Sequence, residues 1–399
     1  MPLGISTKCL QISPSATLAL DAKVKEMRSQ GVDVIGFAAG EPDFDTPLPI
    51  RNAMKMALDE GATRYTPVAG TIALREAISH RILADYGIKY NLNEIIVSNG
   101  AKHSLYNVFQ TILNPEDEVI IPTPCWVSYP EMVKMAGGVT VFVEGTEEDD
   151  FVPCLDKIKQ AITPKTKAFI LTNPSNPNGN IWNIEQLQAL GALAVEHNFY
   201  IISDEIYDKL VYDNIKHNCI ATLSDAIKER TLLVNGVSKT YAMTGFRIGY
   251  TAGPKDIISA MTNYQSQATS APNTPAQHAA TIALTMPQDS ITEMRDAFES
   301  RRDKLVSLIN GIDGLHCRTP KGAFYVMMNI SDLFGKTCDN KLIENSNDFA
   351  NCLLEKAHVA VVPGRAFLAE DYCRLSYATS MQNIEEGLAR ISRFVKELN

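Results

Sequence analysis

The chain has 399 residues, of which 45% are hydrophobic and 21% charged, and 37 Lys and Arg against 46 Asp and Glu give a formal net charge of −9. This apolar fraction excludes a disordered or low-complexity chain, and the acidic balance without a basic run argues against a nucleic-acid-binding protein. No stretch approaches the roughly 18 apolar residues of a membrane span, and the N-terminal residues lack the apolar core of a signal peptide. We expect a soluble, cytoplasmic protein of two or three folding units.

The eight cysteines are scattered along the chain, and no two of them form a C-x-x-C pair. Disulfide frameworks are typical of short secreted chains, and zinc sites need clustered ligands. We therefore expect free thiols in a reducing compartment, with neither disulfides nor a metal site.

The first predicted element is an amphipathic helix over residues 13–30, which ends at Gly31. Seven apolar runs follow. Apart from the last, they are about 20 to 30 residues apart, as in strand–helix–strand units. The runs are apolar throughout rather than alternating, which is typical of strands buried on both faces of a parallel sheet. They end near Val97, Ile121, Val143, Leu171, Ile202, Val234 and Thr251.

Amphipathic helices are predicted between these strands, as over residues 184–197, where Asn183 and Gln186 stand at the N-cap and N3 positions. From about residue 289 the pattern changes to long helices and then to separate strands. We predict an α/β fold. A large domain over residues 47–288 holds a mostly parallel seven-stranded sheet flanked by helices. A smaller α+β domain is built from both chain ends, residues 1–46 and 289–399.

Polar residues follow four of the predicted strands. They are SNGAK (98–102), NPSNPNG (173–179), SDEIY (203–207) and NGVSK (235–239). Ligands of an open parallel sheet bind outside the carboxyl ends of its strands. We therefore expect a site at this edge.

Two charged residues at this edge each have two interpretations. Asp204 follows a buried run, so its carboxylate either pairs with a cation or caps a helix that starts there. Lys239 lies in a strand-exit loop, where it either forms a Schiff base with a carbonyl or remains a surface lysine.

Ser238 and Arg247, together with a helix N-terminus at Gly100 and Ala101, would suit a phosphate dianion. A Schiff-base lysine, a buried carboxylate and a phosphate site are the three requirements of pyridoxal phosphate. Their joint occurrence at strand ends favours that cofactor.

Several segments of the chain resemble the aspartate aminotransferase family of fold-type I pyridoxal enzymes, and its bacterial branch most of all. The resemblance extends in the family's order from about Pro14 to Tyr377. It rests on SPSATLALDAK, GEPDFDTP, RYTPVAGTIALREAI, NPSNPNG, SDEIYDKL, SKTYAMTGFRIGY and CRLSYATS.

The resemblance implies roles for the cofactor residues. Lys239 would form the internal aldimine and shuttle the proton, and Asp204 would pair with the pyridine nitrogen. Tyr207 and Asn176 would bond the phenolic oxygen of the cofactor, on whose ring Trp126 would stack. The implied phosphate ligands are Ser238, Arg247 and the backbone of Gly100 and Ala101.

Tyr65, in RYTP, matches the family position whose side chain reaches the phosphate of the neighbouring subunit. The resemblance therefore implies a homodimer with active sites at the interface.

The substrate residues implied by the resemblance begin with Arg374, which would clamp the α-carboxylate with help from the main chain of Gly40 and the amide of Asn176. Lys102 would meet the side-chain carboxylate of aspartate or glutamate, and Thr17 would close over the same group. A neutral substrate would leave Lys102 uncompensated, which favours dicarboxylates.

The implied reaction is L-aspartate + 2-oxoglutarate = oxaloacetate + L-glutamate, by a ping-pong mechanism with amino-acid and 2-oxo-acid substrates. One alternative is the same scaffold acting on aromatic or other amino acids, or as a lyase. Another is a ligand-binding sensor without turnover. A nucleotide-binding α/β protein is disfavoured because the chain lacks a G-x-x-x-x-G-K-[ST] loop and a G-x-G-x-x-G turn.

Overall fold

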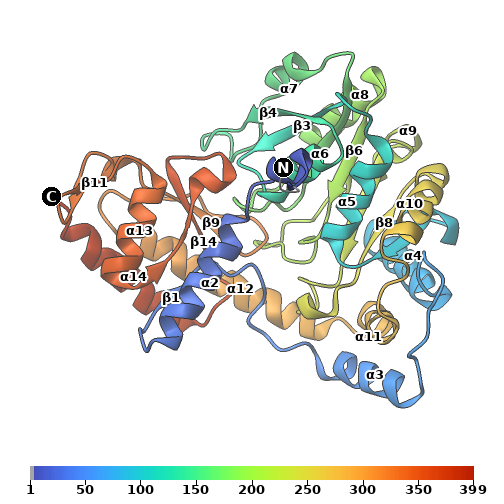
Figure 1. The fold of residues 1–399 in the computed structure, drawn as a ribbon, viewed down its shortest axis with the longest axis horizontal. Helices are drawn as coiled ribbons and strands as arrows, with labels where there is room; N and C mark the ends of the chain where they lie inside the picture. The colour runs from blue at the N-terminus through green and yellow to red at the C-terminus, as the bar shows by residue number, and fades with distance from the viewer. Residues whose placement is uncertain (1–3) are drawn as a thin grey trace.

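A seven-stranded sheet forms the centre of the larger part of the molecule in the computed structural model, which describes residues 4–399 (Figure 1). Its order is β2-β8-β7-β6-β5-β3-β4, and β8 runs antiparallel to both of its neighbours while the other pairs are parallel. The mostly parallel seven-stranded sheet is thus confirmed, with a strand at each predicted run. The strands are β2 (Ile95–Ser98), β3 (Glu118–Thr123), β4 (Val139–Glu144), β5 (Thr166–Thr172), β6 (Tyr200–Asp204), β7 (Thr231–Gly236) and β8 (Gly249–Ala252).

Helices cover both faces of this sheet, so successive residues of a strand, whose side chains point to opposite faces, are both buried. In β3, Ile121 packs in the cluster that holds Phe109 of α5, whereas Ile120 packs with Leu190 of α8 on the other face. Burial on both faces explains the continuous apolar runs. The helices of this part are α3 (Leu48–Asp59), α4 (Ile72–Tyr86), α5 (Ala101–Ile112), α6 (Ser128–Met135), α7 (Leu155–Ala161), α8 (Ile184–His197), α9 (Asp225–Lys228), α10 (Lys255–Ala268) and α11 (Thr274–Thr285).

The predicted start of α8 is confirmed atom by atom. Asn183 Oδ1 accepts a hydrogen bond of 2.8 Å from the backbone N–H of Gln186, and Gln186 Oε1 accepts one of 2.9 Å from the backbone N–H of Asn183. This capping box satisfies two N–H groups that the helix itself leaves unpaired.

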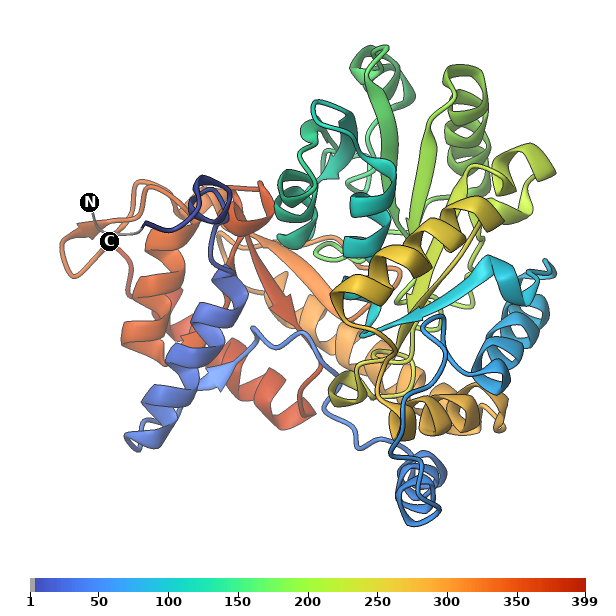
Figure 2. The ribbon, with the colours of Figure 1, turned by 45° about the vertical axis from the view of Figure 1, so that its right-hand side comes forward.

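The second part of the molecule combines both ends of the chain. Its antiparallel sheet has the order β13-β14-β9, and β1 pairs in parallel with β12 through Ile35 and Val359. In both views α2 lies among the helices of the C-terminal third (Figures 1 and 2). The elements are α1 (Thr7–Leu10), α2 (Ala16–Ser29), β1 (Ile35–Gly36), α12 (Asp289–Ile309), β9 (Tyr325–Asn329), β10 (Thr337–Cys338), β11 (Lys341–Leu342), α13 (Ser346–Ala357), β12 (Val359–Ala360), β13 (Val362–Pro363), β14 (Tyr372–Ser376) and α14 (Met381–Lys396).

The helix predicted over residues 13–30 is α2, and it begins at Ala16 because Ser15 is the extended N-cap residue. Gly31 follows it with a φ of +86°, a conformation that glycine adopts without strain. The short α1 before it was not predicted. Short 3₁₀ helices lie at Leu92–Glu94, Ile220–Thr222, Thr244–Phe246, Ser331–Leu333 and Gly364–Phe367.

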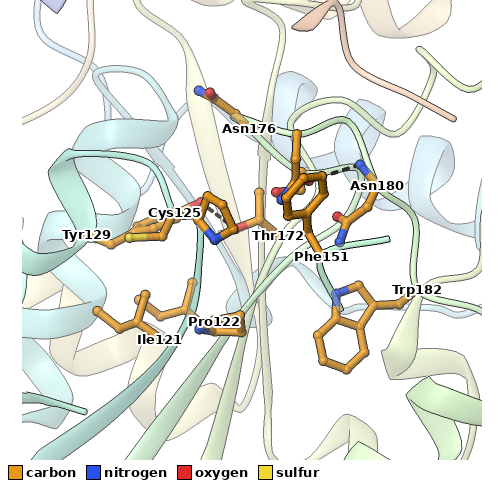
Figure 3. Close-up of a pocket in the computed structure, with 13 residues that line it drawn as sticks. Ile121, Pro122, Cys125, Tyr129, Phe151, Thr172, Asn176, Asn180 and Trp182 are labelled. Atoms are coloured by element: carbon orange, nitrogen blue, oxygen red, sulfur yellow. Dashed lines mark hydrogen bonds between the residues drawn. The ribbon is translucent and has the colours of Figure 1, made fainter. Parts of the chain in front are cut away.

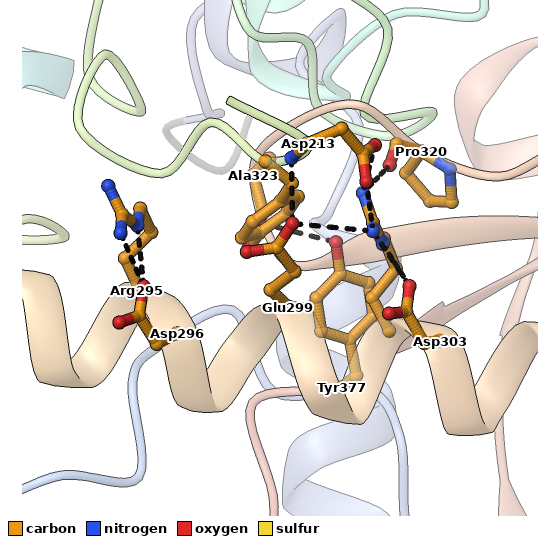
Figure 4. A network of polar contacts seen from close by, with 10 residues as sticks. Asp213, Arg295, Asp296, Glu299, Asp303, Pro320, Ala323 and Tyr377 are labelled. Atoms are coloured by element: carbon orange, nitrogen blue, oxygen red, sulfur yellow. Dashed lines mark hydrogen bonds and ion pairs between the residues drawn. The ribbon is translucent and has the colours of Figure 1, made fainter. Parts of the chain in front are cut away.

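One buried arginine ties α12 to the loop that follows β6 (Figure 4). The Arg302 side chain is only 2% exposed, and its two terminal nitrogens each donate a hydrogen bond of 2.8 Å to the Asp213 carboxylate. Nη2 also lies 2.7 Å from Asp303, and Nη1 donates to the carbonyl of Pro320 at 3.0 Å. The loop after β6 is therefore attached to α12 at Asp213.

Among residues 4–399 no helix is long and apolar enough to cross a membrane. The same residues contain no group of three His, Cys, Asp or Glu side chains that could hold a metal ion. All eight cysteines are free.

Candidate functional site

A cavity of about 420 Å³ lies at the carboxyl edge of the sheet, where α2, the four strand-exit loops and β14 meet. Every site residue predicted from the sequence lines it except Gly100 and Tyr65. Those that line it are Thr17, Gly40, Ala101, Lys102, Trp126, Asn176, Asp204, Tyr207, Ser238, Lys239, Arg247 and Arg374.

The Lys239 amine lies inside this cavity and donates a hydrogen bond to the carbonyl of Gly40. Burial lowers the pKa of Lys239 to about 8, and the nearby positive charges of Arg247 and Arg374 act in the same direction, against the attraction of Glu41. A neutral amine, which is a nucleophile and a base, is therefore populated near neutral pH.

Asp204 is 4% exposed and ends β6. Its Oδ2 accepts a hydrogen bond of 2.7 Å from the Tyr129 hydroxyl, and its Oδ1 accepts one of 3.3 Å from the backbone N–H of Ile206. Burial raises the pKa of Asp204 to about 6 although both hydrogen bonds lower it. A turn follows this residue, so the interpretation of Asp204 as the cap of a helix is wrong. The carboxylate is left facing the cavity.

Tyr207 lies on the same loop and is buried, and its hydroxyl is 3.0 Å from the hydroxyl of Tyr325. Burial raises the pKa of Tyr207 well above its ordinary range, so the phenol stays protonated. It can therefore donate a hydrogen bond into the cavity.

An anion cradle lies at the N-terminus of α5. Gly100 has a φ of +89°, and a Cβ on it would lie 2.4 Å from Nη2 of Arg247. A Cβ on Gly249 would lie 2.2 Å from the backbone nitrogen of Ala101. Only glycine permits this approach, which brings a guanidinium, the buried Ser238 and free helix N–H groups together. Such a donor set suits a phosphate.

Arg374 on β14 is a buried cation, 2% exposed, that lines the same cavity. Its Nη1 donates to Asn176 Oδ1 at 2.9 Å and its Nη2 to the carbonyl of Ala38 at 3.0 Å. The guanidinium lies over the ring of Tyr325, 4.3 Å from its centroid. Its Nε has no hydrogen-bond partner among residues 4–399, and no carboxylate is bonded to the guanidinium there. A planar fork of this kind is suited to a ligand carboxylate.

Lys102, in the first turn of α5, lies at the cavity with its amine 4.8 Å from the centroid of the Trp126 ring. Burial lowers the pKa of Lys102, and Arg247 adds to the effect. Thr17 comes from the start of α2, where its hydroxyl is 3.0 Å from that of Ser15. Lys102 therefore adds a cation to the cavity besides Lys239, Arg247 and Arg374.

Tyr65 is a predicted site residue that does not line this cavity, and it is 94% exposed. Two aromatic residues were missed by the sequence analysis: Tyr129, which bonds Asp204, and Tyr325, which bonds Tyr207. A signal for Tyr129 existed, because it stands three residues after Trp126 and so shares one face of the turn that carries both.

A second, smaller cavity of about 20 Å³ adjoins the first, because Tyr129, Thr172 and Asn176 line both (these side chains are labelled in Figure 3). The Tyr129 hydroxyl lies 2.8 Å from the Thr172 hydroxyl as well as bonding Asp204. This layer of polar side chains supports the back wall of the larger cavity.

Comparison with known proteins gives consistent matches over the whole chain. The family model for aminotransferases of class I and II matches residues 32–391. The chain is 48% identical to the aspartate aminotransferase of Bacillus sp. (strain YM-2), over 98% of this chain and 99% of that one. It is 46% identical to the aspartate/prephenate aminotransferase of Thermus thermophilus, over 98% of each chain.

Solved structures match equally well. An aspartate aminotransferase from Rhizobium meliloti superposes with a TM-score of 0.96 at 41% identity, covering 100% of both chains. The Thermus thermophilus aspartate aminotransferase with maleate gives a TM-score of 0.93 at 44% identity, covering 98% of this chain and 100% of that one.

Proposed function

This chain belongs to the class I and II aminotransferase family and is an enzyme of the transaminase class, and from that premise we propose that its reaction is L-aspartate + 2-oxoglutarate = oxaloacetate + L-glutamate. The observation that carries the proposal is the convergence of Lys239, Asp204 and Arg374 on one cavity that also holds Lys102. Full-length relatives named aspartate aminotransferase support aspartate as the amino donor.

Pyridoxal phosphate is the cofactor that we propose for this cavity, and the residues present fit it. The glycine-lined cradle would hold the phosphate with Ser238 and Arg247, Asp204 would pair with the ring nitrogen, and Lys239 would meet the aldehyde. When bound, this cofactor supplies a carbonyl for the amino group and a ring that withdraws electrons.

The remaining steps belong to side chains of this chain. The Lys239 amine, with a pKa of about 8, can take a proton from the substrate Cα and return it at another carbon. A cation beside Asp204 would offset the effect of burial and keep that carboxylate ionised. Tyr207 and Asn176 would orient the ring by hydrogen bonds, with Trp126 stacked on it.

Substrate orientation follows from the two cations of the cavity, Arg374 and Lys102, that are not assigned to the cofactor. Arg374 would clamp the α-carboxylate, with the Asn176 amide and the main chain of Gly40 beside it. Lys102 would meet the distal carboxylate, and Thr17 would close over that group. A substrate with a neutral side chain leaves Lys102 desolvated and unpaired, which disfavours it.

A second copy of the chain is proposed to complete the site. Tyr65 is 94% exposed, and α3, which projects from the body beside α11, exposes Leu48, Met56 and Leu58 (Figures 1 and 2). Exposed apolar side chains on a projecting helix indicate a protein interface. We propose a homodimer in which Tyr65 reaches the phosphate of the partner subunit.

Two coarser features also remain proposals. One is a division into a large domain over residues 47–288 and a small domain over 1–46 and 289–399. The other is a cytoplasmic location, which suits eight free cysteines.

The test is a panel of half-reactions. The protein loaded with pyridoxal phosphate is mixed with aspartate, glutamate, phenylalanine and alanine in turn, and the loss of its visible absorbance is followed. Aspartate and glutamate are expected to react fastest. Phenylalanine outpacing aspartate would refute the dicarboxylate proposal, and binding without any absorbance change would favour the sensor. Full activity in a Lys239→Ala variant would refute the proposed role of Lys239.

A further inference from the structure

The segment that follows Tyr65 is held by buried hydrogen bonds even though Tyr65 itself is 94% exposed. Gln277 of α11 is fully buried, and its Oε1 accepts a hydrogen bond of 2.8 Å from the backbone N–H of Thr71. Its Nε2 donates to Thr66 Oγ1 at 3.0 Å and to the carbonyl of Pro272 at 2.9 Å. A single side chain therefore grips the segment on the C-terminal side of Tyr65 at two points.

A second buried glutamine, Gln265 of α10, holds the middle of the same segment. Its Nε2 donates to the carbonyls of Val68 and Val97, at 3.0 Å and 2.9 Å. Its Oε1 accepts from Ser98 Oγ at 2.8 Å and from Asn107 Nδ2 at 2.9 Å. A side-chain amide offers two donors and two acceptor sites, so Gln265 uses its complete capacity.

These contacts join the Tyr65 segment to the anion cradle of the same chain. Ser98 ends β2 two residues before Gly100, and Asn107 lies on α5, whose N-terminus forms the cradle. Gln265 touches both of these elements and Val68. Displacing its amide would therefore disturb the cradle and the Tyr65 segment together.

The chemical character of the two residues argues for a positional role. Both glutamines are 0% exposed, and Ser98 and Asn107, which bond Gln265, are buried with it. A buried amide adds little net stability even when its hydrogen bonds are made, and it is costly when they are not. What a fully bonded amide provides over an apolar side chain is a defined direction for each neighbour.

We propose that Gln265 and Gln277 are positioning residues for cofactor phosphate, which makes the inference dependent on the proposed function of the site. Gln277 orients the segment that carries Tyr65 toward the phosphate of the partner subunit. Gln265 links that segment to the cradle of its own chain, so the two phosphate sites of a dimer share one rigid connection.

The test compares two probes that differ only in the phosphate group. Cofactor-free full-length protein is titrated with pyridoxal phosphate and with pyridoxal, and the ratio of the two Kd values is measured. We expect Gln277→Met and Gln265→Met each to weaken pyridoxal phosphate binding by about 10-fold, the effect of one misplaced buried hydrogen-bonding group, with pyridoxal unchanged. The matched control is Ser79→Ala, which removes the buried hydrogen bond of 2.6 Å to the Tyr90 carbonyl, away from the site.

A thermodynamic cycle with Tyr65→Phe identifies the route. If Gln277 acts through Tyr65, Gln277→Met has no further effect on the Kd ratio in the Tyr65→Phe background, whereas additive effects would overturn the proposed route. An unchanged ratio in both glutamine variants, or an equal loss for both probes, would overturn the proposal as a whole. A wild-type protein that binds neither probe contradicts the proposed function instead.

A measurement on the unaltered protein guards against variants that do not fold. The backbone N–H of Thr71 is bonded only to a side chain. Hydrogen exchange at Thr71 is expected to be as slow as in β2. Exchange at the rate of an unprotected peptide would refute a rigidly held segment.

Discussion

The Tyr129 hydroxyl donates a hydrogen bond of 2.7 Å to Oδ2 of Asp204, across 75 residues of chain. This bond favours the charged carboxylate, whereas burial favours the neutral acid, and burial is the larger influence on the pKa of Asp204. Above about pH 6, Asp204 is therefore a buried anion whose charge a neighbouring cation would stabilise. The pKa of Asp204 can therefore be measured in the cofactor-free protein, and it reports how burial and the Tyr129 hydrogen bond act on the carboxylate.

The first prediction concerns the stability of the cofactor-free protein against pH. The pKa of Asp204 is about 6 in the folded state against an ordinary 3.8. The folded state therefore binds the extra proton between about pH 4 and 6, and stability present below pH 4 is lost as the pH rises through 6. The difference corresponds to about 3 kcal/mol, so Asp204→Asn should be more stable than wild type by that order above pH 7 in urea unfolding. An equal loss of stability in both proteins would contradict the assignment.

The second prediction removes the hydrogen bond described above. In Tyr129→Phe the carboxylate loses a donor that stabilises its charge, so the pKa of Asp204 should rise further above about 6. Urea unfolding of this variant against pH, compared with Tyr129→Phe/Asp204→Asn, measures the change. A titration midpoint that is unchanged, or shifted to lower pH, would show that the Tyr129 hydroxyl does not stabilise the charge of Asp204.

The third prediction concerns the reactivity of Lys239. With a pKa of about 8, its neutral fraction rises about tenfold per pH unit below 8 and levels off above. The rate at which borohydride traps pyridoxal phosphate on Lys239 in cofactor-free protein should follow that curve. Peptide mapping identifies the residue, and Lys134, an exposed lysine paired with Glu131, serves as the internal reference. Trapping that still rises steeply at pH 10 would indicate an ordinary lysine.

The fourth prediction tests the carboxylate clamp. Arg374→Lys keeps the charge but loses the planar fork. The value of kcat/KM for aspartate should therefore fall roughly 30- to 1000-fold, which corresponds to a loss of about 2 to 4 kcal/mol of transition-state stabilisation. The Kd for pyridoxal phosphate should change much less, because Arg374 is not among the residues proposed to hold the phosphate, the ring or the aldehyde. If the variant lost only affinity for the cofactor, Arg374 would bind the cofactor and not the substrate carboxylate.

The fifth prediction tests the distal cation. Lys102→Met should lower kcat/KM for aspartate by about 10- to 100-fold and should not lower that for alanine, since only a distal carboxylate pairs with Lys102 and a neutral side chain leaves it unpaired. Lys134→Met, which alters an exposed lysine, is the matched control. Equal losses of kcat/KM for aspartate and alanine would show that Lys102 does not determine substrate specificity.

Much of this protein follows from short-range sequence. The limits of α8 could be predicted because Asn183 and Gln186 bond each other's backbone within one turn. The strands could be predicted because residues such as Ile120 and Ile121 must both be apolar when helices cover both faces. Lys239 and Asp204 were found because parallel strands deliver their exit loops to one edge.

Other features depend on which distant surfaces pack together, and no local pattern encodes that. Arg374 meets Asn176 from 198 residues away, and Tyr129 meets Asp204, only because β14 and α6 are packed against the strand-exit loops. The short segment around Tyr65 contains no sign of the two buried glutamines that hold it. The residue types of the site were therefore determined by sequence. Their charge states and orientations were decided by the tertiary structure, because burial and partners set both.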